Sequence, residues 1–156
     1  MDAGTEEMKI PRLPPLLLVL ILAITMLVLD RALPLFRLLH PPIAYLGAAP
    51  VALGVLIVLI SAGLFRFRKT TINPFGEPAV MVQDGFYRFS RNPMYLGMLL
   101  VLAGIGLWLG NVLALLLAPA FVVIMTRWYI VREEQVLEDR FGEVYRAYRS
   151  RVRRWI

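Results

Sequence analysis

The residues best suited to chemistry lie in two short polar segments of an otherwise apolar chain. The first segment, residues 83–97 (QDGFYRFSRNPMYLG), places two arginines and two tyrosines around a helix start at Asn92-Pro93. Asn is a preferred N-cap residue, and Pro fits the first helical position. The free N–H groups and dipole at such a helix end attract carboxylates or phosphates, although ordinary capping would explain the same residues.

The second segment, residues 127–134 (RWYIVREE), follows the last apolar stretch. Glu133 and Glu134 are adjacent, so on a helix their side chains point about 100° apart and do not form a catalytic pair. A solvated charged run at a helix end is the ordinary interpretation of such a segment. A functional interpretation is favoured because five polar side chains of the two segments can meet at one end of a helical bundle. These are Tyr87, Tyr95, Arg91, Arg127 and Glu133.

The chain contains no cysteine and a single histidine, His40. This composition excludes disulfides, thiolate metal sites and cysteine nucleophiles, and it excludes a histidine-based zinc site. Any chemistry must therefore use carboxylates, arginines, tyrosines and the backbone, and we expect no bound metal.

The elements that must position these residues are predicted to be membrane helices. Hydrophobic residues make up 59% of the chain, and four stretches lack Asp, Glu, Lys, Arg and His: residues 13–29, 43–65, 94–109 and 112–126. A spanning helix needs about 17–25 apolar residues, so the last two stretches require their flanks or a thin membrane. We expect an all-α integral membrane protein with four transmembrane helices and a C-terminal amphipathic helix.

We expect one domain over residues 1–156. It comprises a polar N-terminus (1–12), two helices (13–65), a loop (66–93), a helical hairpin (94–130) and an amphipathic tail (131–156) that can lie on the membrane or fold over the bundle. Residues Trp155-Ile156 are predicted to anchor the tail at the interface.

The net charge of +6 reflects an uneven distribution along the chain. Fifteen of the 17 basic residues fall in the N-terminus, in the loop or between Arg127 and the end of the chain, and four spans place these three segments on one side. The preference of Lys and Arg for the cytoplasm then predicts that both termini and the loop are cytosolic, in a multi-pass protein of a prokaryotic inner or plasma membrane. The basic excess suits an anionic leaflet better than a nucleic acid.

Two motifs, taken in order, resemble a known family. Residues 91–97 (RNPMYLG), followed after the hairpin by EExxLxxxFGxxYxxY over residues 133–148, are similar to the isoprenylcysteine carboxyl methyltransferase family. That family belongs with the membrane phospholipid methyltransferases. The resemblance covers residues 70–154 and implies a helical membrane enzyme whose S-adenosylmethionine lies in a cytosolic pocket closed by the C-terminal region, with a lipophilic acceptor entering from the bilayer.

The resemblance also implies individual site residues. The cofactor-binding positions fall on Val80, Met81, Val82, Tyr87, Arg91, Asn92, Pro93, Met94, Tyr95 and Glu133. The family's substrate arginine would stand at Tyr129, so Arg127 or Arg132 is expected to replace it. We take Arg127 as the catalytic arginine and Glu134, with Tyr129 as the alternative, as a base. Asn92 stands where eukaryotic members have His, and it cannot titrate as a base.

Methyl transfer from a sulfonium is an in-line displacement, so positioning two reactants is the main catalytic task. Glu133 is suited to the cofactor's ammonium, and tyrosine faces attract a sulfonium by cation–π interaction. The acceptor is expected to be a lipophilic small molecule, a lipid amine or a lipidated peptide with a prenylcysteine-like carboxylate. The alternative is a non-catalytic membrane scaffold or binding protein with a degenerate methyltransferase fold.

Overall fold

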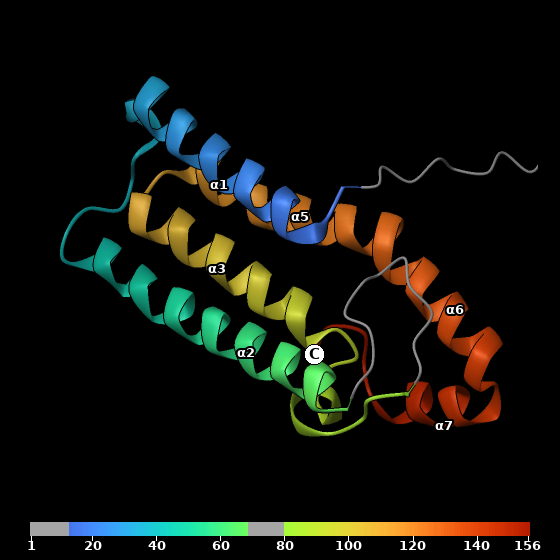
Figure 1. Ribbon diagram of the computed structural model, residues 1–156. Helices are drawn as coiled ribbons and strands as arrows, with labels where there is room; N and C mark the ends of the chain where they lie inside the picture. The colour runs from blue at the N-terminus through green and yellow to red at the C-terminus, as the bar shows by residue number, and fades with distance from the viewer. Residues whose placement is uncertain (1–12, 69–79) are drawn as a thin grey trace, which may run out of the picture.

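The computed structural model describes residues 13–68 and 80–156, which form helices joined by short turns (Figure 1). The predicted polar N-terminus and residues 69–79 of the predicted loop lie outside the described residues. No β-strand occurs in the described part of the chain, although Arg37 and Asn111 form an isolated bridge. The expected all-α class is therefore confirmed.

The first two helices correspond to the first two apolar stretches. Helix α1, Pro15–Ala32, begins with Pro at its first position and ends just before Leu33-Pro34. Two short 3-10 helices, η1 (Pro34–Phe36) and η2 (Ile43–Gly47), lead into α2, Ala48–Phe67. Because η2 runs directly into α2, the two form one apolar segment of 25 residues.

Three helical segments within the described residues are long and apolar enough to cross a membrane: Pro15–Ala32, Ile43–Phe67 and Val112–Phe141. Helix α3, Pro93–Leu109, is apolar but has only 17 residues, so the predicted count of four spans is not established. Many large apolar side chains on α1 and α2 are exposed, among them Leu16, Leu20 and Leu59. Such extended apolar surface suits contact with lipid.

Helices α2 and α3 pack against each other through glycines. A Cβ atom on Gly54 would lie 2.4 Å from the carbonyl oxygen of Gly97, and one on Gly104 would lie 2.6 Å from that of Gly47. Gly47, at the end of η2, and Gly54 of α2 are seven residues apart, as are Gly97 and Gly104 of α3, so each pair lies on one face about two turns apart. Small residues of this kind let membrane helices approach closely.

The helical hairpin expected over residues 94–130 reverses direction at Gly110-Asn111. Gly110 has φ 68°, in the left-handed region that favours glycine. The Asn111 side chain accepts from the N–H groups of Leu113 and Ala114 and thereby caps α4, Val112–Leu115.

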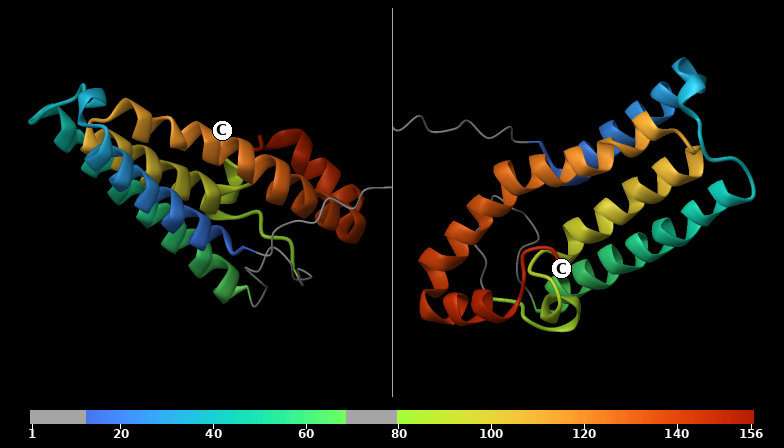
Figure 2. Two further views of the ribbon diagram at one scale, coloured as in Figure 1. Left: turned by 90° about the horizontal axis from the view of Figure 1, so that it is seen from above. Right: turned by 180° about the vertical axis from the view of Figure 1, so that it is seen from behind.

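The rest of the chain is one long helical run that bends back at its end (Figures 1 and 2). Helices α4 and α5 (Leu117–Met125), the π-helical turn η4 (Thr126–Ile130) and α6 (Val131–Phe141) follow one another, so the fourth apolar stretch gains its length from a polar continuation. Gly142, with φ 49°, then ends α6, and α7 (Glu143–Arg151) returns towards the start of α3.

Two expectations for the tail are corrected by this arrangement. The single amphipathic helix expected from residue 131 is divided at Gly142, and its second part folds over the end of the bundle. Trp155 contacts the protein, because its Nε1–H donates to Thr126 Oγ1 at 3.2 Å and its side chain packs against the core, whereas Ile156 is 77% exposed and its interfacial role stays a prediction. Both differences arise because the tail finds partners within the protein.

Candidate active site

The candidate site lies where the start of α3, the start of α6 and the end of the chain meet. Asn92 occupies the N-cap position of α3 as predicted, but its side chain makes no capping hydrogen bond. Its Nδ2–H instead donates to the carbonyl oxygen of Arg154 at 2.9 Å, and Ser90 Oγ accepts from its backbone N–H at 3.1 Å. The predicted cap thus binds the tail.

Tyr95 and Glu133 join α3 to α6 at this site. The Tyr95 hydroxyl donates to Glu133 Oε1 at 2.5 Å, and Tyr95 is 7% exposed. Tyr87, in the short 3-10 helix η3 (Gly85–Arg88), is also buried, and its ring centroid lies 5.4 Å from that of Phe65. Burial and the nearby charge of Glu133 raise the pKa of Tyr87, so its hydroxyl stays protonated and able to donate.

Glu133 lies in α6, in the polar continuation of the Val112–Phe141 segment that follows Val131. Burial raises the pKa of Glu133 to about 7, with a further upward contribution from the charge of Glu134, while the Tyr95 hydrogen bond acts in the opposite direction. Among the described residues, no Arg, Lys or His forms an ion pair with Glu133. A partly buried carboxylate without a basic partner suits a cationic ligand.

Glu134 has a different environment, as expected for adjacent positions on a helix. Arg154 donates to both of its oxygens, at 2.9 and 2.6 Å, and Arg91 donates to Oε1 at 2.8 Å. Burial alone would raise the pKa of Glu134, but the Arg154 hydrogen bonds and the charges of Arg91, Arg154 and Arg149 outweigh it and lower that pKa. A carboxylate held in this way is a poor proton acceptor, so the geometry does not support its predicted role as a base.

The two arginines expected near the acceptor are on the outside of the long helix. Arg127, in η4, and Arg132, in α6, are both exposed, and no ion pair within the described residues involves either. Tyr129, the alternative base, is 2% exposed and its hydroxyl donates to the carbonyl oxygen of Leu13 at 2.7 Å. The guanidinium of Arg127 is thus accessible to a ligand, whereas the Tyr129 hydroxyl is used in a hydrogen bond to the backbone.

The remaining predicted cofactor residues lie in the segment before η3 and in the first turn of α3. Val80 is 45% exposed, Val82 is 7% exposed, and Met81 packs against the buried cluster of Tyr145, Tyr148 and Val152. Within the first turn of α3, Pro93 is buried and Met94 is partly buried.

Sequence reasoning missed two side chains that complete this arrangement. Arg154 is the bidentate partner of Glu134, and the Tyr148 hydroxyl donates to the carbonyl oxygen of Tyr87 at 2.7 Å. Tyr148 was part of the second motif, so the motif itself carried a signal for it. The position of Arg154 in a run of arginines at the end of the chain carried none.

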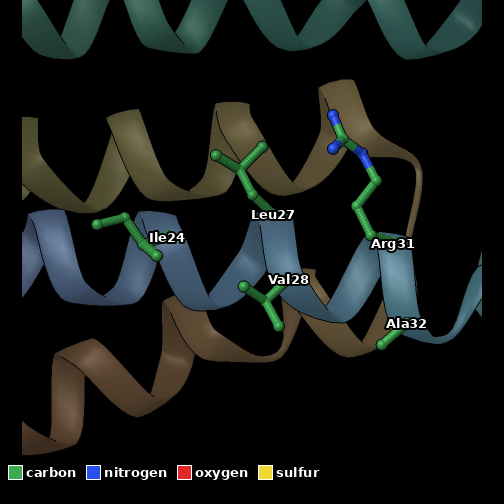
Figure 3. Close-up of a pocket in the computed structure, with 5 residues that line it drawn as sticks. All are labelled: Ile24, Leu27, Val28, Arg31 and Ala32. Carbon is green, nitrogen blue, oxygen red and sulfur yellow. The ribbon is translucent and has the colours of Figure 1, made fainter.

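A hollow elsewhere on the molecule is apolar and lies at the opposite end of the bundle. It is lined by five residues of α1, shown in Figure 3: Ile24, Leu27, Val28, Arg31 and Ala32. The Arg31 side chain extends from α1 over the ribbon of α3 (Figure 3). Four of these five residues are apolar, so the hollow resembles the lipid-facing surface around it more than a reaction site.

Comparison with known proteins agrees with this arrangement. A family model described as phospholipid methyltransferase matches residues 43–144, which is more than half of the chain. The chain belongs to the phospholipid methyltransferase family. It is an integral membrane protein, and the family predicted from the paired motifs is confirmed.

Individual relatives match parts of the chain. An uncharacterized protein of Haemophilus influenzae is 48% identical over 63 residues, which cover 40% of this chain and all of that protein. The protein-S-isoprenylcysteine O-methyltransferase of Schizosaccharomyces pombe is 33% identical over 76 residues, or 47% of this chain and 31% of that enzyme.

A solved structure shares the fold. It is that of the eukaryotic intramembrane Ras methyltransferase, isoprenylcysteine carboxyl methyltransferase, with a TM-score of 0.61 and 21% identity. The match covers 99% of this chain but 56% of that one, so this chain spans about half the length of the solved enzyme.

Proposed function

We propose that this protein transfers a methyl group from S-adenosylmethionine to a lipophilic acceptor at the cytosolic face of the membrane. The observation that carries the proposal is Glu133, a partly buried carboxylate that accepts a hydrogen bond from Tyr95 and has no basic partner among the described residues. Such a group lacks a cation, and the cofactor's α-ammonium is a cation of suitable size and chemistry. Membership of a methyltransferase family supports the same ligand.

S-adenosylmethionine, when bound, supplies an electrophilic methyl group on a sulfonium. The residues of this chain would hold it: Glu133 accepts from the ammonium, and the Tyr95 hydroxyl keeps the Glu133 side chain in place. Tyr87 lies close enough to Glu133 for the carboxylate charge to raise the pKa of its hydroxyl. The Tyr87 ring offers a π face to a positive charge. The catalytic task left to the protein is to orient an acceptor and to exclude water.

The acceptor is proposed to be a group that is already nucleophilic, namely a lipid amine or the carboxylate of a lipidated peptide. Glu134 is held by two arginines and Tyr129 donates into the fold, so neither is placed to remove a proton. An unprotonated amine or a carboxylate needs no such base. The exposed Arg127, on the α5–α6 run near the site, could pair with an acidic group on the acceptor.

The orientation is proposed from charge alone. The site lies at the end of the bundle where the loop and tail meet, and these segments carry most of the basic residues. Positive residues collect on the cytoplasmic side of membrane proteins, so the site and both termini are proposed to be cytosolic.

Binding and turnover of S-adenosylmethionine test the proposal. Calorimetry in detergent should detect S-adenosylhomocysteine, and ligand at 100 times its Kd should stabilise the protein by about 2.7 kcal/mol. Radiolabelled cofactor incubated with total membrane lipids and lipidated peptides should label one of these classes. Absence of both heat and thermal stabilisation would reject the enzyme. Cofactor binding without labelling of any acceptor would favour a non-catalytic binding protein with a degenerate methyltransferase fold.

A further inference from the structure

The end of the chain is tied to the start of α6 by an ion-pair cluster next to Glu133. Arg154 and Arg91 both donate to Glu134, Arg154 through two hydrogen bonds and Arg91 through one. The side chains of Glu134 and Arg91 are only 8% and 9% exposed, and that of Arg154 is 33% exposed. Ion pairs removed from solvent in this way are screened less than surface pairs.

Hydrogen bonds to the backbone hold Arg154 beside the start of α3. The Arg91 N–H donates to the Arg153 carbonyl at 2.9 Å, and Asn92 Nδ2 donates to the Arg154 carbonyl at 2.9 Å. Arg91 Nη1 also donates to the Arg149 carbonyl at 3.1 Å. The backbone at Arg153 and Arg154 is therefore fixed beside the start of α3, and this position places the Arg154 guanidinium next to Glu134.

Glu133 and Glu134 are adjacent in the first turn of α6. The contacts that fix the position of Glu134 therefore also fix the backbone that carries Glu133. Glu133 meets the Tyr95 hydroxyl only if that turn stays against α3, and Arg154 is the residue that bridges the tail to it. We propose that Arg154 is a positioning residue for the methyl-transfer site, which acts through Glu134 to orient Glu133 and to offset the negative charge beside it. This inference rests on the function proposed above.

The charges around Glu133 distinguish this role from one in which Arg154 only holds the tail against α6. The titratable groups facing Glu133 are Tyr95 from α3, Tyr87 from η3 and Glu134 from its own helix. The charge of Glu134 raises the pKa of Glu133, and Arg154 offsets that charge. Removal of Arg154 should therefore raise this pKa further, whereas removal of the Glu134 charge should lower it.

Cofactor binding across pH gives the readout, because Glu133 must be ionised to bind an ammonium. Calorimetry with S-adenosylhomocysteine on the full chain in detergent, from pH 5.5 to 9, gives the pH at which affinity is half-maximal. We expect Arg154→Gln to shift this midpoint upward by roughly 0.5–1 pH unit and Glu134→Gln to shift it downward by a similar amount. Arg146→Gln is the matched control, since the exposed Arg146 of α7 pairs with Glu138 of α6 and Glu143 of α7, and the midpoint of this variant should equal that of the wild type.

The outcomes separate the two proposals. Wild-type binding with midpoints that do not move, or that move in the same direction in both variants, would overturn the role of Arg154. No binding by the wild type at any pH would instead refute the proposed function on which it depends. If Arg154→Gln does not fold, Arg154→Lys keeps the charge and should retain the wild-type midpoint with weaker affinity, and a missing downward shift in Glu134→Gln would still overturn the inference.

Discussion

The sharpest consequence of the structure concerns the charge on Glu133. Glu133→Gln keeps the length of the side chain and an oxygen that can accept from Tyr95, whose hydroxyl lies 2.5 Å from Oε1. It removes only the negative charge. Because the variant preserves the local packing, a change in cofactor affinity reports the ion pair and not a collapsed site.

The magnitude follows from the burial and titration of this carboxylate. A hydrogen bond to a charged partner contributes about 1.5–3 kcal/mol, which corresponds to a roughly 10- to 100-fold weaker Kd. Since the pKa of Glu133 is about 7, the wild-type side chain is ionised almost completely at pH 8.5 and only about one tenth at pH 6. We therefore expect the full loss at pH 8.5 and a much smaller difference between wild type and variant at pH 6.

Calorimetry with S-adenosylhomocysteine at both pH values measures this effect. Glu143→Gln is the matched control, because the Glu143 side chain is 86% exposed and its removal takes away the same charge from α7. Equal affinities of the wild type and Glu133→Gln at pH 8.5 would refute the placement of the ammonium. A loss of the same size at both pH values would refute the raised pKa.

Three further predictions test the acceptor side, the topology and the helix packing. Arg127→Leu should leave cofactor affinity unchanged and lower turnover, as measured by methyl transfer, and unimpaired turnover would make Arg127 an ordinary solvated charge. In this cysteine-free chain, a cysteine at Gln83 should react with impermeant reagent only from the cytosol and one at Leu38 only from outside; the reverse pattern would invert the orientation. Gly97→Ala should destabilise the protein by about 1–3 kcal/mol, because its Cβ would lie 2.6 Å from the Gly54 carbonyl, while Gly63→Ala, with open space around it, should be neutral by thermal unfolding.

Much of the fold was predictable because its signals are local. Uninterrupted apolar stretches predicted the positions of α1, α2 and α3, and Pro93 predicted the first residue of α3. The reversal of the predicted hairpin also depends on local residues, since Gly110 tolerates a left-handed backbone and Asn111 caps the next helix. Each of these residues acts within a few positions of itself, so its effect can be read without knowing what packs against it.

The contacts that build the site could not be predicted in the same way. Arg154 lies 20 residues from Glu134 and 62 from Asn92, and one arginine among several near the end of the chain has no distinguishing neighbour. The break at Gly142 was not predicted, and the direction in which α7 turns depends on the surfaces it meets. The glycine contacts between α2 and α3 likewise required knowledge of which helices are neighbours.

Asn92 illustrates how the paired motifs serve both the site and the fold. The family resemblance implies His at this position in eukaryotic members, which would point to a lost base if the residue worked by titration. In this structure its side chain donates a hydrogen bond to the Arg154 carbonyl, a task that needs an N–H donor and no change of protonation. A neutral His also carries an N–H donor, so either residue can hold the end of the chain beside α3. The substitution is therefore compatible with an intact site, because what this position requires is a donor at the point where the tail meets the motif.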